Sequence, residues 1–360
     1  MQNRGAAPDG TRVVPAARGT GVGGRKTIGD IARAAGVSKG AVSYALNGKP
    51  GVSDVTRQRI LAIAEELGWH PSSAARALSD GRTGVLGLIV DRPARTLGIE
   101  SFFMQLISGI EATLSARDVG LLLQVTDDQQ REMAAYRQWW ARQRVDGVIL
   151  VDLRADDPRV PLLEELGMPC VVIGGPEGLG TLPGIWSDDG AAITSVVEYL
   201  AALGHRRIAR VAGLPNLYHT ALRDRGVAAA AERLGLDEVI TVYADYTGEE
   251  GARATRTLLS RRPAPTAVIY DNDVMAVAGV AVAHEMRVSI PADLSVVAWD
   301  DSPLCQLVHP QLSAVNRDIA AYGAHAAQRL LEIVEGTPAV SVQDPTPQLV
   351  PRGSTAAPGR

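Results

Sequence analysis

From Gly84 onward, short apolar runs alternate with amphipathic stretches, and this alternation constrains the fold more than any other feature of the chain. The first four runs are GVLGLIV, GLLLQV, DGVILV and PCVVIG at 84–90, 120–125, 146–151 and 169–174. A second series, RIARVAG, VITVY, TAVIY and SVVAW, lies at 207–213, 239–243, 266–270 and 295–299. Apolar periodicity predicts helices between them, at about 100–117, 129–143, 189–203, 249–260 and 273–287. The pattern therefore predicts two doubly wound α/β subdomains, which bind ligands at the carboxyl ends of their strands.

Charge separates the start of the chain from the rest. Residues 1–82 hold 12 of the 36 Lys/Arg and 6 of the 40 Asp/Glu, a net charge of +6. The remainder keeps 24 basic and 34 acidic residues, a net charge of −10. This distribution suits a small head that meets phosphates. A basic disordered tail without a specific partner would have the same charge, so both readings stay open.

Composition narrows the class of protein. With 46 % hydrophobic and 21 % charged residues, the chain is neither disordered nor collagen-like. It has no apolar run of about 18 residues, so no membrane contact is expected. Cys170 and Cys305 form no CxxC motif, as expected of buried thiols in a reducing compartment. Residues 1–26, rich in Gly, Pro, Ala and Arg, read as a disordered basic arm and not as a secretory signal, which predicts a cytoplasmic protein.

Residues 27–70 carry the signals of three short helices. Thr27 and Asp30 resemble a capping box, Gly36 permits a sharp turn, and Ser38 and Ser53 are candidate N-caps. The apolar stripes predict a small core that includes Ile31, Val42, Ala45, Leu46, Val55, Ile60, Ala64 and Leu67. This arrangement indicates a helix-turn-helix unit whose second helix (38–47) would enter the major groove. An ordinary three-helix bundle fits the same pattern.

Several segments of the sequence also resemble those of a known protein family. The segment TIGDIARAAGVSKGAVSYALNGKPGVSDVTRQRI and the blocks RVDGVILV, LGHRRIARVAG, PTAVIYDNDVMA and IPADLSVVAWDD resemble the LacI/GalR family of transcription regulators over about 27–355. The resemblance implies an all-α helix-turn-helix head plus an α/β periplasmic-binding-protein-like effector domain of two doubly wound subdomains. The expected order is the arm (1–26), the DNA-binding domain (27–70), a hinge helix and linker (71–83), the effector-binding and dimerisation domain (84–350) and a disordered tail (351–360).

The resemblance also implies a set of DNA-binding residues. Lys39, Gly40 and Tyr44 stand where family members read base edges, although Tyr44 replaces a frequent arginine. Residues placed for phosphate contacts are Thr27, Ser38, Ser43, Asn47 and Arg57. In the hinge, Leu78 matches the leucine that wedges into the minor groove, and Ala75 is among the small residues that let two hinge helices pack. A solvated helix face and a flexible linker are the alternatives.

The effector cleft of the family supplies a second set. The resemblance assigns effector contacts to Phe102, Phe103, His219, Arg223, Tyr246, Asn272, Asp273 and Asp300. One of the two phenylalanines is expected to anchor its helix to the core instead. The chain departs from the family in two places: Gly174-Gly175 stands where an acidic ligand contact is common, and Glu100-Ser101 replaces the usual Asn-Pro.

Together these features predict a transcription regulator. The resemblance implies a homodimeric repressor on a palindromic double-stranded DNA operator, controlled by a small, sugar-like effector. The alternative is a cytoplasmic small-molecule-binding protein without regulatory DNA binding. No GxSxG, HExxH or P-loop motif is present, and the histidines have no metal spacing, so no enzyme activity, cofactor or metal is expected.

Overall fold

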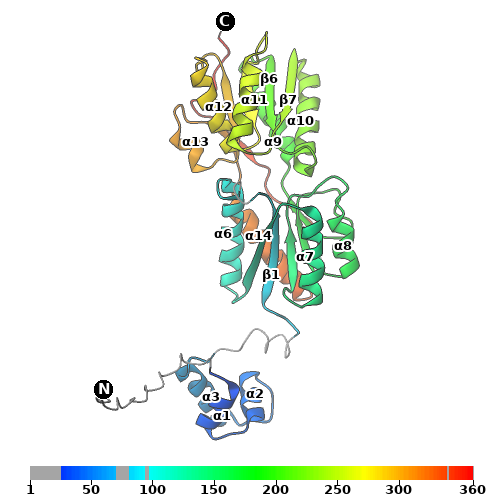
Figure 1. Ribbon diagram of the computed structural model, residues 1–360, viewed down its shortest axis with the longest axis vertical. Coiled ribbons are helices and arrows are strands. Elements are labelled where there is room, and N and C mark those ends of the chain that lie inside the picture. Colours follow the sequence, from blue (N-terminus) through cyan, green and yellow to red (C-terminus); the bar gives the residue numbers. More distant parts are fainter. Residues whose placement is uncertain (1–25, 70–80, 94–96, 339, 360) are drawn as a thin grey trace, which may run out of the picture. The chain divides into compact units, whose positions relative to one another are not determined.

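The computed structural model describes residues 26–69, 81–93, 97–338 and 340–359 (Figure 1). Contacts within the chain divide it into two units, Met1–Ala75 and Arg76–Arg360, which are treated separately below. The predicted arm, apart from Lys26, lies outside the described residues. So does most of the predicted hinge, including Ala75 and Leu78.

The first unit contains three helices, α1 (Ile28–Ala35), α2 (Lys39–Leu46) and α3 (Asp54–Glu66). The predicted caps form: Thr27 N donates to Asp30 Oδ2 at 2.9 Å, and Ser38 Oγ accepts from Ala41 N at 3.1 Å. Gly36 makes the turn between α1 and α2 with a φ of 64°, a conformation that glycine adopts without strain. Ile31, Val42, Ala45, Ile60 and Ala64 form the buried core, with Leu46 and Leu67 half-buried against it.

Val55 corrects one core prediction, because it is 79 % exposed. It precedes Ile60 by five residues, which places it about 140° around the helix from the buried stripe of α3. An apolar residue in the first turn of a helix therefore did not indicate burial here.

The second unit contains two six-stranded sheets with orders β11-β5-β4-β3-β1-β2 and β12-β10-β9-β8-β6-β7. The first sheet defines the N-terminal subdomain and comprises β1 (Val85–Asp91), β2 (Gly120–Thr126), β3 (Gly147–Leu150), β4 (Cys170–Ile173), β5 (Gly184–Trp186) and β11 (Val342–Gln343). The second defines the C-terminal subdomain and comprises β6 (Arg207–Ala212), β7 (Glu238–Tyr243), β8 (Ala267–Tyr270), β9 (Ser295–Trp299), β10 (Ser313–Asn316) and β12 (Gln348–Val350). Strands pair in parallel except β10 and β12. Both predicted subdomains are confirmed.

Helices cover both sheets, as Figure 1 shows. The N-terminal subdomain carries α6 (Ser101–Ser115), α7 (Gln129–Ala141), α8 (Arg159–Leu166) and α14 (Ile319–Val334). The C-terminal subdomain carries α9 (Asp189–Ala202), α10 (Tyr218–Leu234), α11 (Gly248–Leu259), α12 (Asp273–Glu285) and α13 (Pro303–Leu307). None of these described helices is long and apolar enough to cross a membrane.

Helix α14 lies in the N-terminal subdomain although it follows β10 of the C-terminal subdomain in sequence. It packs against α6 at very short range, because a Cβ on Gly109 would lie 1.8 Å from the Ala320 carbonyl oxygen. The chain therefore passes between the subdomains after β5, after β10 and again between β11 and β12. Three connections hold the strand ends of the two sheets on either side of one space.

The end of the chain corrects another prediction. Residues 351–359, expected to be disordered, continue from β12 and pack on the C-terminal subdomain. Ser354 is fully buried: its Oγ donates to the Val296 carbonyl at 2.6 Å and accepts from Ser313 N at 2.8 Å. These hydrogen bonds lie between segments distant in sequence, so Pro-rich composition alone could not reveal them.

Candidate functional site

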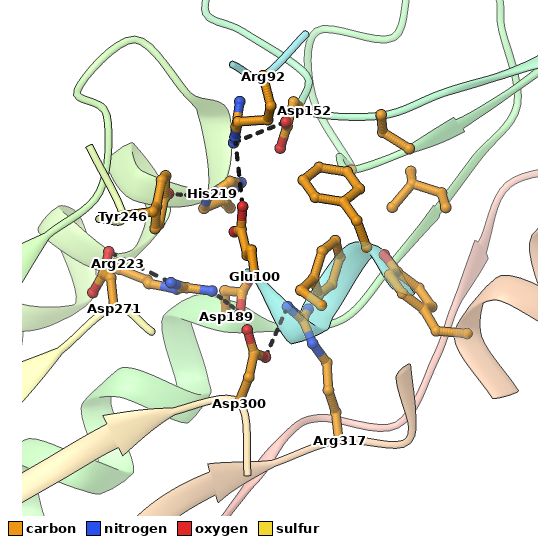
Figure 2. Close-up of a pocket in the computed structure, with 16 residues that line it drawn as sticks. Arg92, Glu100, Asp152, Asp189, His219, Arg223, Tyr246, Asp271, Asp300 and Arg317 are labelled. Atoms are coloured by element: carbon orange, nitrogen blue, oxygen red, sulfur yellow. Dashed lines mark hydrogen bonds and ion pairs between the residues drawn. The ribbon is translucent and has the colours of Figure 1, made fainter. Parts of the chain in front are cut away.

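A cavity lies between the carboxyl ends of the strands of the two subdomains. It holds about 620 Å³ of empty space, part of it open to solvent. Six of the eight predicted effector residues line it, namely Phe102, Phe103, His219, Arg223, Tyr246 and Asp300. Figure 2 shows the labelled side chains converging on this space from both subdomains.

The other two predicted residues, Asn272 and Asp273, are buried but do not line the cavity. Asn272 caps α12: its Oδ1 accepts from Met275 N at 2.8 Å, and its Nδ2 donates to the Tyr246 carbonyl at 2.9 Å. Asp273 accepts a hydrogen bond from Ser101 Oγ of the other subdomain at 3.1 Å. In this structure they hold neighbouring residues in place.

The phenylalanines divide the two roles expected of them. Phe103 is buried in the core of the N-terminal subdomain, whereas Phe102 is half-buried. Both rings reach the cavity and meet edge to face with centroids 5.2 Å apart. A guanidinium lies over each ring, Arg317 at 5.0 Å from Phe102 and Arg92 at 5.6 Å from Phe103. The rings thus give the cavity an apolar wall with cations at its edges.

Arg223, on α10, is held by a buried series of charges. Its guanidinium donates to Asp189 Oδ1 at 3.2 Å, forms an ion pair with Asp271 at 3.4 Å and stacks 3.9 Å from the centre of the Trp299 ring. Asp271 also accepts two hydrogen bonds from Arg210, at 2.8 and 2.6 Å. Burial by itself would raise the pKa of Asp271, but the Arg210 and Arg223 guanidiniums lower it to about 2. Asp271 is therefore ionised and fixes the orientation of Arg223.

Tyr246 and His219 form a neutral pair in the same wall. Burial, followed by the charge of Arg223, lowers the pKa of His219 to about 4, and burial raises the pKa of Tyr246. The 2.7 Å contact between His219 Nε2 and the tyrosine hydroxyl is thus a hydrogen bond between two neutral groups. A Cβ on Gly213 would lie 1.9 Å from the tyrosine oxygen, so only glycine leaves room for this ring. Tyr246 also has a φ of 68°, unusual for a bulky residue.

Several charged residues that line the cavity were not predicted from the sequence. Arg92 follows β1, Asp152 lies just past β3 and Arg317 directly follows β10. Arg92 pairs with Asp152 at 2.8 Å, and Arg317 pairs with Asp300 at 3.3 Å. Their position at strand ends was a usable signal, because the carboxyl ends of parallel strands are where this architecture places ligands.

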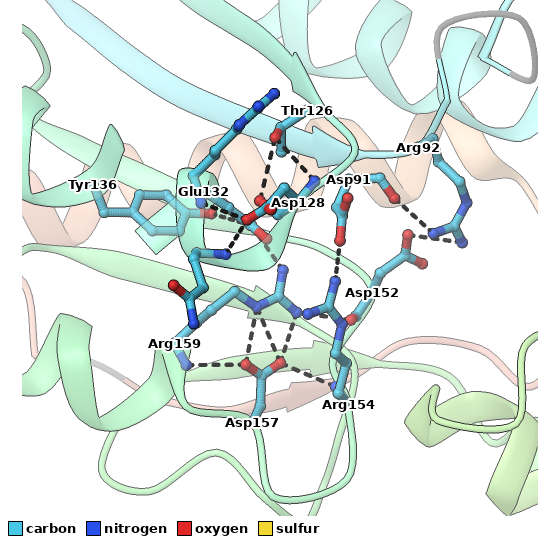
Figure 3. Close-up of polar contacts among 12 residues, drawn as sticks. Asp91, Arg92, Thr126, Asp128, Glu132, Tyr136, Asp152, Arg154, Asp157 and Arg159 are labelled. Carbon is cyan, nitrogen blue, oxygen red and sulfur yellow. Dashed lines mark hydrogen bonds and ion pairs between the residues drawn. The ribbon is translucent and has the colours of Figure 1, made fainter. Parts of the chain in front are cut away.

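A second polar network, shown in Figure 3, holds the backbone of Asp152 through its carbonyl oxygen. Arg159 is buried and donates to Glu132 Oε1 at 2.8 Å, to Asp157 and to the Asp152 carbonyl oxygen at 2.8 Å. Burial raises the pKa of Glu132 despite the opposing charge of Arg159. Arg154 pairs with Asp91 beside this network. The backbone of Asp152, with a φ of 53°, is thereby held so that its carboxylate faces the cavity.

Backbone hydrogen bonds join the subdomains next to the cavity. Tyr218 N donates to the Leu153 carbonyl at 2.7 Å, and Ala155 N donates to the Asn216 carbonyl at 3.2 Å. These bonds connect the segment after β3 with the segment before α10. They add to the Ser101–Asp273 contact and hold the two walls together in this structure.

Several buried polar atoms of the residues that line the cavity lack a hydrogen bond in the described part of the chain. The donors are Arg92 Nε, Arg223 Nε and Arg317 Nε, and the acceptors are Glu100 Oε2 and Asp300 Oδ1. Unpaired buried polar groups are unfavourable, so a ligand that supplies both donors and acceptors would be stabilised here. Hydroxyl groups do both.

The first unit presents most of its predicted DNA-binding residues to solvent. Thr27, Ser38, Lys39, Gly40 and Asn47 are exposed, Tyr44 is 48 % exposed and Ser43 is half-buried. Arg57 differs, because its guanidinium donates to the Lys49 and Ala45 carbonyls and so ties α3 to the end of α2. Part of its hydrogen-bonding capacity is therefore already used within the fold.

Comparison with known proteins resolves the alternatives. A family model described as "Bacterial regulatory proteins, lacI family" matches residues 27–72, and one described as "Periplasmic binding protein-like domain" matches residues 197–355. The HTH-type transcriptional regulator CelR of Thermobifida fusca is 32 % identical over 316 residues, which cover 87 % of this chain and 93 % of CelR. The chain belongs to the LacI family. The resemblance predicted from the sequence is confirmed.

Other members agree with this result. MalR of Streptomyces coelicolor is 34 % identical over 350 residues, covering 92 % of this chain and 97 % of MalR. The lac repressor dimer bound to operator and the anti-inducer ONPF aligns with a TM-score of 0.82 at 25 % identity, over 92 % of this chain and all of that one. The CelR–cellobiose complex aligns with a TM-score of 0.70 at 30 % identity over the same shares.

Family membership fixes the general function. The chain is a LacI-family transcription regulator that binds DNA and responds to an effector, and it is not an enzyme. Within the described residues, no group of three or more His, Cys, Asp and Glu side chains is arranged to hold a metal ion.

Proposed function

We propose that this regulator is a cytoplasmic homodimeric repressor whose affinity for a palindromic operator is controlled by a neutral, sugar-like effector. The observation that carries the effector class is the set of unpaired donors and acceptors around the cavity. Guanidinium and carboxylate groups alternate there, which suits hydroxyl groups that donate and accept at once. The aromatic wall of Phe102 and Phe103 suits the apolar face of a sugar ring.

Charge argues for a neutral effector. Of the charged side chains that line the cavity, Arg92, Arg223 and Arg317 face a larger number of carboxylates. One of these carboxylates, Asp271, is already matched by Arg210 behind it. No excess of positive charge is left for a phosphate or carboxylate group of a ligand, in contrast to sites that recognise anions.

The relatives support the same class of effector. One solved relative is the CelR–cellobiose complex, and its fold aligns with nearly the whole of this chain. The lac repressor relative is a dimer on its operator, which supports a homodimer whose two heads meet two half-sites. In such a dimer, exposed Lys39, Gly40 and Tyr44 on α2 would read bases, and Thr27, Ser38, Ser43, Asn47 and Arg57 would contact phosphates.

The test is selection of bound duplexes from a randomised DNA library, with and without a panel of neutral sugars. We expect a palindrome to be enriched by the wild type, and enrichment to fall when the matching sugar is present. Lys39→Ala should lower affinity for that palindrome by about 1–3 kcal/mol because it removes a base contact. Lys49→Ala, outside the predicted base-reading set, is the matched control. An effector-binding protein without regulatory DNA binding would enrich no sequence under either condition.

A further inference from the structure

Glu100 is the one acidic residue at the start of α6 that turns into the cavity, and it stands where the family resemblance has a neutral Asn-Pro. Its side chain is nine-tenths buried, and its Oε2 accepts no hydrogen bond. The nearest cation is Arg92, whose Nε lies 3.9 Å away. Arg92 makes a closer pair with Asp152 at 2.8 Å. The positive charge of Arg92 is therefore closer to Asp152 than to Glu100.

Other carboxylates face Glu100 from every element around it. Asp152 comes from the end of β3, Asp300 from the end of β9, and Asp273 from the first turn of α12. Asp300 is balanced by Arg317, and Asp273 only by the Ser101 hydroxyl and nearby neutral groups. Two further groups share a pocket with Glu100: Tyr246, which is neutral, and the exposed carboxylate of Glu249. Burial first, and then these like charges, raises the pKa of Glu100 to about 8 against the opposing effect of Arg92.

We propose that Glu100 is a specificity-determining residue of the effector cavity: its carboxyl group donates a hydrogen bond to an acceptor oxygen of a neutral sugar. The inference rests on the proposed function and adds to it the group that reads the effector. A neutral acid at this position has one donor to offer, because Glu100 lines the cavity and its buried Oε2 has no hydrogen bond within the described residues. A phosphate placed beside it would face several carboxylates at short range.

The role has a consequence for pH. A sugar that binds only the protonated acid keeps a constant affinity below the pKa of Glu100 and loses about tenfold for each pH unit above it. Binding above about pH 8 is accompanied by uptake of one proton. If Glu100 instead accepted a hydrogen bond from the sugar as an ion, affinity would rise with pH over the same range.

The test uses the full-length protein with cellobiose, maltose and glucose 6-phosphate as probes, titrated by calorimetry between pH 6 and pH 9.5. The wild type is expected to bind at least one of the two neutral sugars, with the pH profile above, and to bind glucose 6-phosphate at least about tenfold more weakly. Glu100→Gln keeps a donor, so it should bind within about threefold of the wild type at neutral pH but without the decline at high pH. Glu249→Gln, at an exposed carboxylate of a neighbouring pocket that Glu100 and Tyr246 also line, is the matched control and should keep the decline.

A second measurement needs no ligand. Because the folded-state pKa of Glu100 is raised, its ionisation destabilises the fold progressively from about pH 4.5 to about pH 8. The melting temperature of Glu100→Gln minus that of the wild type should therefore increase over this range and then level off. A flat difference for Glu100→Gln would show that Glu100 ionises normally and would overturn the proposal.

The two failures can be told apart. A wild type that binds cellobiose or maltose with no pH dependence, or with the same dependence in Glu100→Gln, contradicts the role of Glu100 and leaves the proposed function standing. A wild type that binds neither neutral sugar but binds glucose 6-phosphate contradicts the proposed effector class as well.

Discussion

Two groups of charged residues in the cavity walls differ in how completely their charges are paired. In the C-terminal subdomain, Arg210, Asp271, Arg223 and Asp189 form a continuous buried series in which each charge has a partner of opposite sign. In the N-terminal subdomain, Glu100 has no hydrogen bond on Oε2 and a single distant cation. The first wall holds its binding group in a fixed orientation before a ligand arrives. The second leaves the Glu100 carboxyl group without a hydrogen bond on Oε2, and a ligand can supply that bond.

This difference separates residues that position another side chain from residues that contact the effector directly. Asp271 touches the cavity, but its hydrogen bonds go to Arg210 and the Gly213 N–H, so its main effect on a ligand is through Arg223. Removal of one charge from the paired series around Asp271 should therefore lower the free energy of unfolding. Replacement of Glu100 by a neutral side chain should raise it. The variants below test that contrast in order of expected effect.

Asp271→Ala should have the largest effect. It leaves the fully buried Arg210 and the buried Arg223 without their shared partner, and breaking a buried pair in this way costs about 3–5 kcal/mol of unfolding free energy. Urea unfolding followed by circular dichroism measures the loss. The double variant Arg210→Met with Asp271→Ala should recover part of it, because fewer charges stay buried. A loss below about 1 kcal/mol in the single variant would mean that the wall is not organised as described.

Arg223→Lys should abolish effector control with less damage to the fold. Lysine keeps the charge but loses the planar stack on Trp299 and the forked contacts to Asp189 and Asp271. We expect effector affinity to fall by at least about tenfold, with ligand-free operator binding unchanged. The matched control is Arg225→Lys on the same helix, where the arginine is largely exposed. Equal effects of the two substitutions would argue against Arg223 as an effector contact.

Tyr246→Phe should give the smallest change. The substitution removes the hydroxyl that is hydrogen-bonded to His219 Nε2 and leaves that buried ring nitrogen unpaired, at a cost of about 1–2 kcal/mol. The pKa of His219 should then be read from the pH dependence of unfolding. The pKa of His219 in the folded protein is lowered to about 4, so the free energy of unfolding decreases as the pH falls below the ordinary pKa of histidine. We expect the variant to show the same decrease with falling pH. Tyr243→Phe, on an exposed tyrosine, is the control.

The sequence predicted features that depend on neighbours in the chain. Thr27, Ser38 and Ser53 cap helices within three residues of themselves, so the DNA-binding head could be located from local signals. The apolar runs from Gly84 predicted the central strands because each is buried on both faces. Strands β5 and β10 were missed because each contains only two apolar residues, fewer than β3, β4 and β8. Helix α10 was also missed, since its few apolar residues are interrupted by charge.

The candidate site was predictable only in part, for a physical reason. Arg223 and Asp300 could be assigned through family resemblance, but which partner neutralises each one depends on chain segments far apart. The Arg210–Asp271 pair joins residues 61 positions apart, and Arg317 reaches Asp300 only because β10 lies beside β9. The same holds for Ser354, whose burial in the sheet overruled the composition around it. The local sequence pattern predicts where the strands end. Which residues at those ends face each other depends on how distant segments pack.

The central claim is that a neutral sugar in this cavity controls DNA binding, and an operator-release titration tests it most directly. Fluorescence anisotropy of the selected operator would be followed while cellobiose, maltose or glucose 6-phosphate is added to the wild type and to Arg223→Lys. We predict that a neutral sugar shifts operator affinity of the wild type by about tenfold or more, a coupling of about 1.4 kcal/mol, and leaves Arg223→Lys unchanged. The claim is contradicted if only the phosphorylated sugar acts, or if the variant responds at the same sugar concentration as the wild type.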